Sequence, residues 1–194
     1  TPEKSDANNL YTQYAKKGMT AENITDKQLG YLYKATKDDA VSTMQSKKAS
    51  KEEVNSAVET FGKLNKIDTD NVVKKNRDKL NVGEETKVTE SGASVDVKGI
   101  KLGATPTLIT SEGEVSADEV TLSDRDADLV ARAQLMPEEV ANLYLSQADG
   151  QTDIEAYTNS FNLVSAYAEN NFDQNTILER KGVLSTDQVK AIYK

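Results

Sequence analysis

Residues 95–122 read VDVKGIKLGATPTLITSEGEVSADEVTL, and this stretch decides the fold class because its apolar residues do not follow helical spacing. Short groups of β-branched residues and leucines alternate with glycines, which is typical of short strands joined by turns. We expect about three to five antiparallel strands between residues 83 and 122. The segment from Leu108 to Leu122 predicts a hairpin with its turn at Glu112-Gly113, because glycine accepts the positive φ that tight turns need.

Helical spacing precedes this stretch. Leu10, Tyr11 and Tyr14 predict a helix that ends at Gly18. Thr25-Asp26-Lys27-Gln28 and Ser50-Lys51-Glu52-Glu53 are both capping-box patterns, in which a hydroxyl and an amide or carboxylate satisfy free N–H groups at a helix start. A separate helix is predicted from about Asp70 to Leu80, ending before Gly83.

Helical spacing returns after the strands. Helix starts are expected at Ser123, at Met136-Pro137 and at Ser185-Thr186-Asp187-Gln188. The helix between them carries the most regular apolar stripe of the chain, through Ile154, Tyr157, Phe161, Val164, Tyr167 and Ala168. Such a stripe is more often the core side of a helix than an exposed aromatic ridge for a partner.

These patterns predict an α+β fold that is mostly helical, with a small antiparallel β-sheet or SH3-like β-insert in the middle. A set of strands this small must pack on the helices or form a minimal barrel. By composition the chain divides into helical residues 1–82, β-rich residues 83–122 and helical residues 123–194, as one compact unit or two small domains.

Two similar helical hairpins are expected at the ends of the chain. Asn9-Leu10 with Tyr14-Ala15 recurs as Asn162-Leu163 with Tyr167-Ala168, at a constant offset of 153 residues. The pattern from Ile24 to Lys34 recurs from Leu184 to Lys194 at an offset of 160 residues. The competing explanation of this internal repeat is that unrelated helices often share the same capping residues followed by an apolar stripe. Because the second pattern stops in mid-helix, we expect the chain to be a piece of a longer protein.

Several residue types that are common in catalytic sites are missing from the sequence. The 194 residues include no histidine, cysteine or tryptophan, which excludes imidazole bases, thiolate nucleophiles, soft metal ligands and disulfides. Carboxylate, lysine, tyrosine and hydroxyl groups remain, but they are common on ordinary surfaces. No catalytic, cofactor-binding or metal-binding residues are therefore predicted, and no cofactor.

The formal net charge of −8 is uneven. Residues 1–80 carry 15 Lys and Arg against 12 Asp and Glu, whereas residues 81–194 carry 9 against 20. An anionic surface repels phosphate backbones, so nucleic acid is disfavoured as a partner; the cluster of Lys74, Lys75, Arg77 and Lys79 is interpreted as a solvated helix face. No run approaches the roughly 18 apolar residues of a membrane span, so no membrane association is expected.

Two groups of carboxylates invite a metal interpretation. Asp149-Gly150-Gln151-Thr152-Asp153-Ile154-Glu155 lacks the ligand spacing of an EF-hand, and a turn leading to a helix capped by Asp153 explains it better. Asp124, Asp126 and Asp128 are expected to diverge around a helix start rather than to converge on one ion.

Several features of residues 88–193 follow one another in a recognisable order. They are the turn at Glu112-Gly113, Leu122-Ser123-Asp124, Ala141-Asn142-Leu143-Tyr144-Leu145, Asp149-Gly150, the helix through Tyr157 and Tyr167, and the closing Leu184 to Tyr193. This order resembles a region of the large polyvalent proteins encoded by bacterial conjugative elements and phages. The resemblance implies a non-catalytic region between enzymatic modules, and it implies a cytoplasmic location.

The first functional hypothesis is therefore a non-catalytic interaction or spacer module of a larger bacterial mobile-element protein, whose partners are other proteins or flanking domains of the same polypeptide. An extracellular ligand-binding or adhesive domain is the alternative, since the chain is acidic, polar and free of cysteine. A carboxylate-based hydrolase is the second alternative.

Overall fold

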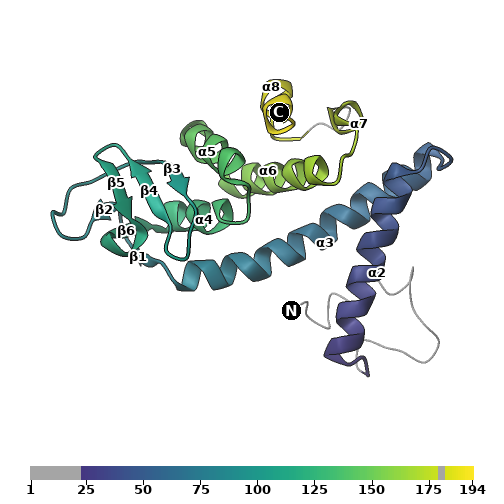
Figure 1. Cartoon of the computed structure of the whole chain (residues 1–194), viewed down its shortest axis with the longest axis horizontal. Helices are drawn as coiled ribbons and strands as arrows, with labels where there is room; N and C mark the ends of the chain where they lie inside the picture. The colour runs from purple at the N-terminus through teal and green to yellow at the C-terminus, as the bar shows by residue number, and fades with distance from the viewer. Residues whose placement is uncertain (1–22, 179–181) are drawn as a thin grey trace. The chain divides into compact units, whose positions relative to one another are not determined.

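The structure is a computed structural model that describes residues 23–178 and 182–194. Helices dominate, and the strands form two small sheets, so the fold is α+β as predicted (Figure 1). The expected helix around Leu10 and Tyr14 lies outside the described residues. The chain divides into two compact units, Thr1–Asn71 and Val72–Lys194, which are described separately. This boundary falls before residue 82, and the β-rich residues share a unit with the helices that follow them.

In the first unit a helical hairpin is formed by α2 (Asp26–Gln45) and the beginning of α3 (Lys51–Asp78) (Figure 1). The predicted capping box at Thr25 is present, with the Gln28 N–H donating to Thr25 Oγ1 and the Thr25 N–H donating to Gln28 Oε1. Between the helices lies a small core of Ile24, Leu29, Leu32, Tyr33 and Leu64, against which Ile67 packs.

One prediction about α3 is wrong, because no new helix begins near Asp70. Instead α3 runs uninterrupted from Lys51 to Asp78 and crosses the boundary between the units. The polar residues that suggested a break are accommodated by bonds within the helix: Thr69 donates its hydroxyl to the Asn65 carbonyl, and Lys66 pairs with Asp70 at 2.8 Å. The helix start at Ser50 is as predicted, since the Glu53 N–H donates to Ser50 Oγ at 3.1 Å.

In the second unit the predicted hairpin forms one antiparallel sheet with a third strand. Its order is β3 (Val97–Lys101), β4 (Thr107–Thr110) and β5 (Gly113–Ser116). Thr110 pairs with Gly113 across the turn, where Gly113 adopts a φ of +101°. The hairpin ends at Ser116 rather than at Leu122, because a 3₁₀ turn at Ala117–Glu119 redirects the chain.

The remaining strands form a second sheet, which the sequence did not predict. It has the order β1 (Asn81–Gly83), β6 (Val120–Ser123) and β2 (Lys87–Val88). β1 pairs with β6 in parallel, so the prediction of a purely antiparallel strand set is wrong at this point. Gly83 faces the Thr121 side chain so closely that a Cβ there would lie 2.6 Å from Thr121 Cγ2.

Five helices of the second unit start after strand β6. They are α4 (Asp124–Ala133), α5 (Glu138–Gln147), α6 (Ile154–Glu169), α7 (Gln174–Leu178) and α8 (Thr186–Ile192). The starts expected at Ser123, Pro137 and Ser185 are all present, the last as a complete capping box. The sheets pack on these helices, β3 against α5 and β6 against α4, which is the first of the two packing modes expected.

The aromatic stripe of α6 is the core of the second unit. Tyr157 and Phe161 are fully buried, and Tyr167 is 1% exposed. Tyr144 on α5 stacks on Tyr157 with ring centroids 5.4 Å apart. The stripe is therefore a packed interior, as predicted, rather than a ridge exposed to a partner.

The predicted repeat can be compared in its second part, which pairs the residues from Ile24 to Lys34 with those from Leu184 to Lys194. Ile24, Leu29 and Leu32 are buried around the first capping box, and the equivalent Leu184, Val189 and Ile192 are buried around the second. The block that contains Tyr14 lies outside the described residues. Two unrelated helices that each begin with a capping box would show the same pattern, so duplication of the hairpin stays a prediction.

Candidate functional site

The carboxylates that the sequence analysis singled out have structural roles. Asp153 caps α6, where its carboxylate accepts the Ala156 N–H at 3.0 Å, as predicted. Asp149 lies in a 3₁₀ turn at Ala148–Gly150. Within residues 23–178 and 182–194, no three acidic side chains are grouped so that they could hold a metal ion.

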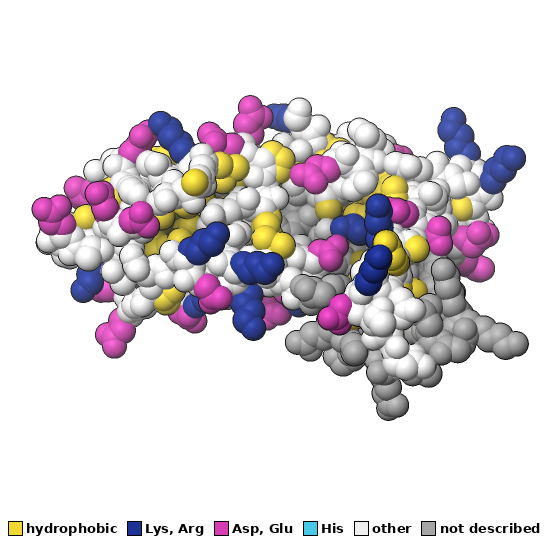
Figure 2. Space-filling view, turned by 60° about the horizontal axis from the view of Figure 1, so that its bottom comes forward, with side chains coloured by type: hydrophobic (Ala, Val, Ile, Leu, Met, Phe, Trp, Pro, Cys, Tyr) yellow, Lys and Arg dark blue, Asp and Glu magenta, His cyan; other side chains and the backbone are white. Residues whose placement is uncertain are grey.

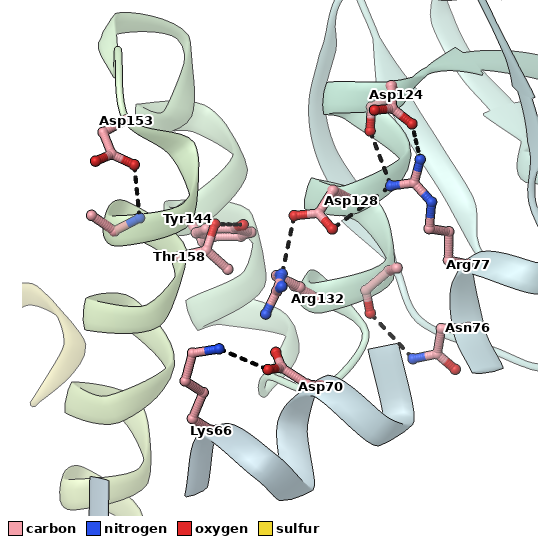
Figure 3. Close-up of polar contacts among 12 residues, drawn as sticks. Lys66, Asp70, Asn76, Arg77, Asp124, Asp128, Arg132, Tyr144, Asp153 and Thr158 are labelled. Carbon is pink, nitrogen blue, oxygen red and sulfur yellow. Dashed lines mark hydrogen bonds and ion pairs between the residues drawn. The ribbon is translucent and has the colours of Figure 1, made fainter. Parts of the chain in front are cut away.

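Asp124 and Asp128 converge, contrary to expectation, on a cation supplied by the protein itself. Both carboxylates pair with the guanidinium of Arg77 near the end of α3, and Arg132 bonds Asp128 at 3.0 Å (Figure 3). Residues four apart share a helix face, and this explains the convergence. Asp126 instead accepts a hydrogen bond from the Thr86 hydroxyl. The network fastens the end of α3 to α4.

The predicted basic cluster is divided by this network. Lys74, Lys75 and Lys79 are exposed, whereas Arg77 is directed toward α4. On the face drawn in Figure 2, cationic and anionic side chains are interspersed rather than gathered by sign. Lys74 and Lys75 on α3, and Lys79 directly after its end, are thus solvated, and Arg77 belongs to the scaffold.

Two buried tyrosines join α5 to α6 and are likewise structural. The Tyr157 hydroxyl donates to the Tyr144 carbonyl at 2.9 Å. The Tyr144 hydroxyl shares a hydrogen bond with Thr158 at 2.7 Å (Figure 3). The Tyr144 carbonyl lies in the last turn of α5, where carbonyls lack helical partners. Burial raises the pKa of both phenols well above the ordinary tyrosine value.

One feature of the described residues with room for a ligand is a pocket of about 460 Å³ between α5, α6 and α8, which we call the α6–α8 pocket. Its apolar walls come from the start of α5, the end of α6 and the end of α8. Its polar groups share no hydrogen bond with one another among the described residues. The lining residues are Pro137, Val140, Ser165, Ala168, Glu169, Asn171, Phe172, Ile192 and Tyr193.

One side of the pocket is built by the way α6 ends. The Phe172 N–H donates to the Tyr167 carbonyl and the Asn171 N–H to the Ala168 carbonyl, both at 3.1 Å, which is a Schellman motif. Asn171 occupies the left-handed position with a φ of +59°. The turn places the Phe172 ring against the Tyr167 ring, with centroids 5.4 Å apart. A local backbone motif therefore positions one aromatic wall.

Tyr193 lines the pocket with its ring, while its hydroxyl group is buried in the protein. Its hydroxyl oxygen is buried and has no hydrogen-bond partner in the described part of the chain. Burial, aided by the negative charge of Asp173, raises the pKa of Tyr193 to about 12. The phenol is consequently neutral at physiological pH, and its oxygen is not accessible from the pocket.

The pocket combines a hydroxyl, a carboxylate, an amide and apolar walls, and such a set can bind a partly polar group. Nucleophilic catalysis by Ser165 would need a base hydrogen-bonded to its hydroxyl, and no such bond exists within the described residues. The sequence analysis missed this site. Asn170-Asn171 directly after a helical stripe was the available signal, because asparagine favours the left-handed position that ends a helix.

Comparisons with known proteins found no matching family, no matching curated protein and no matching solved structure. The described helices include none that is long and apolar enough to cross a membrane.

Proposed function

We propose that this chain is a non-catalytic interaction module of a larger bacterial mobile-element protein, which binds a protein partner or a flanking domain of the same polypeptide. The observation that carries the proposal is the α6–α8 pocket, which lies between three helices of the second unit. Pockets that combine apolar walls with a few polar groups are the usual form of ligand sites.

The disposition of the charged residues supports a binding role. Arg77, Asp124, Asp128 and Arg132 are engaged with one another, and Asp153 caps a helix. These groups are already used to hold helices together, so they are poorly suited to act on a substrate. These charged groups therefore stabilise the second unit, whereas, among the described residues, the polar groups of the pocket take no part in their network.

The experiment begins from the reading frame that encodes the chain. Flanking helicase or methylase motifs are expected, and each flanking module would be produced separately and titrated into this chain by isothermal calorimetry. Saturable binding to one of them, weakened by Ala168→Leu in the pocket wall, supports the proposal. Asn159→Leu, on the same helix outside the pocket lining, is the matched control.

Two alternatives predict different results. An upstream signal peptide or lipobox would favour an extracellular ligand-binding or adhesive domain. Turnover of glycoside, ester or peptide substrates by the purified chain, lost on replacement of a single carboxylate, would favour a hydrolase.

A further inference from the structure

We propose that the α6–α8 pocket binds a lysine or arginine side chain presented by a partner segment. The inference rests on the proposed function in one respect, namely that the partner is a protein. It adds the chemical identity of the group that enters the pocket, and it can fail while the interaction role stands.

The electrostatics of the pocket favour a cation. Glu169 is the last residue of α6, where the exposed carbonyls of the helix end already carry negative partial charge. A basic residue is the stabilising choice at such a position, yet the last turn of α6 has none. Glu169 also forms no ion pair in the described part of the chain, although Lys190 and Lys194 flank Tyr193 in the sequence. A carboxylate in this place is unfavourable for the helix alone, so it points to an external partner.

A second carboxylate strengthens the same field. Asp173 is near enough to Tyr193 for its charge to act on the phenol. The start of α5 contributes the opposite sign, because N–H groups at a helix start attract anions. Glu138 and Glu139 occupy that first turn and offset its positive charge. The start of α5 therefore contributes little positive charge to oppose Glu169.

The apolar walls fit the stem of a long basic side chain. Val140, Ala168, Phe172 and Ile192 form these walls. Lysine and arginine bury their methylene groups along apolar surface and keep the charged end near polar groups. A small metal ion or free ammonium ion would leave such walls unused, whereas a basic side chain uses both the walls and Glu169.

The test is an NMR titration of the isotope-labelled chain with three capped tripeptides. Their central residue is lysine, neutral norleucine or glutamate, each between glycines. The lysine peptide is expected to shift the resonances of Glu169, Phe172 and Tyr193 saturably, and to bind about threefold to fivefold more tightly than the norleucine peptide. Raising the salt concentration to about 0.5 M should remove most of that difference, since the site is open to solvent.

Variants separate the charge from the fold. Glu169→Gln should reduce the lysine preference to near unity, whereas Glu155→Gln, in the exposed first turn of the same helix, should leave it unchanged. The NMR spectrum of each variant should show that its fold is unchanged, so that these comparisons are valid.

Equal binding of the lysine and norleucine peptides would overturn the inference, as would tighter binding of the glutamate peptide or the absence of any shift at the pocket. None of these results affects the calorimetric test with flanking modules, so failure of this inference and failure of the proposed function are distinguishable.

Discussion

The side-chain amide of Asn142 forms both main-chain hydrogen bonds of Ile100. Asn142 Oδ1 accepts the Ile100 N–H at 2.9 Å, and Asn142 Nδ2 donates to the Ile100 carbonyl at 3.2 Å. Ile100 is itself fully buried on β3, so this single asparagine on α5 joins a sheet to the helices through two bonds at once.

Asn142→Leu should therefore destabilise the chain by about 2–4 kcal/mol, because it leaves a buried N–H and a buried carbonyl without partners. Urea denaturation followed by circular dichroism measures the loss. Ser146→Ala, which removes a hydroxyl bonded only to its own helix, is the control and should cost less than about 0.5 kcal/mol. Equal losses in both variants would show that the Asn142 bonds are not important for stability.

Gly83→Ala should destabilise the parallel pairing of β1 with β6 by about 1–3 kcal/mol, since the new methyl group would collide with Thr121 Cγ2. Thr121→Ser removes the opposing methyl group, so the double variant should recover much of the loss. Gly150→Ala is the control, because a Cβ at Gly150 meets nothing within 4 Å. A double variant as unstable as Gly83→Ala would contradict the proposed clash.

Asn171→Val should destabilise the end of α6 by about 1–2 kcal/mol, because a β-branched residue resists the φ of +59° found there. Asn171→Gly should be neutral or slightly stabilising, since glycine accepts this conformation without strain. Thermal unfolding distinguishes the two variants. If valine and glycine had equal effects, the left-handed backbone at Asn171 would not be the cause.

Stability should fall at alkaline pH because of the buried tyrosines. Burial raises the folded-state pKa of Tyr144 and Tyr157 above the unfolded value of about 10, so the unfolded chain ionises first as the pH rises. Each such tyrosine removes about 1.4 kcal/mol of stability per pH unit between the two pKa values, and its contribution is fully present below about pH 9.

The measurement is urea denaturation at several pH values from about 8 to 12. Tyr157→Phe should lower the overall stability but make its decline above pH 10 less steep. Tyr31→Phe should leave the decline unchanged, because Tyr31 is 62% exposed. A slope that is the same in all three proteins would assign the decline to other groups.

DNA binding should be undetectable near physiological salt. The exposed lysines of the basic cluster are only three, Lys74, Lys75 and Lys79, and Arg77 is engaged with Asp124 and Asp128. Fluorescence anisotropy with duplex DNA at about 0.15 M salt tests this expectation. Sub-micromolar affinity would overturn it, and replacing those three lysines by glutamine, with Arg77 retained, would then show whether this helix face is responsible.

The helix starts were predictable because their signals are local. Thr25, Ser50, Ser123 and Ser185 each cap a helix through bonds to residues three positions ahead, and sequence alone displays that spacing. The continuity of α3 was not predictable in the same way. Thr69 and Asp70 are poor helix formers, so no local signal shows that they lie inside one helix, where Thr69 bonds to Asn65 and Asp70 pairs with Lys66.

The pairing of strands that are distant in the chain could not be predicted from the sequence. β1 is three residues long, and its parallel partner β6 begins at Val120, so no hydrophobic alternation could reveal the pair. The α6–α8 pocket likewise depends on how three helices meet. Its one local signal is the Asn170-Asn171 pair, and its carboxylate, Glu169, is indistinguishable by type from other surface acids.

The bonds from α5 to β3 also bear on self-association. Ile100 and Leu102 direct their outward main-chain groups to Asn142 and Glu138, which lie one turn apart on α5. The helix thus occupies the place that another strand would take, so an intruding strand from a second copy cannot pair there without first displacing it. Assembly of copies through sheet extension, a first step toward fibrils, is therefore blocked along this edge by α5 and by the two polar side chains that bond it to the strand.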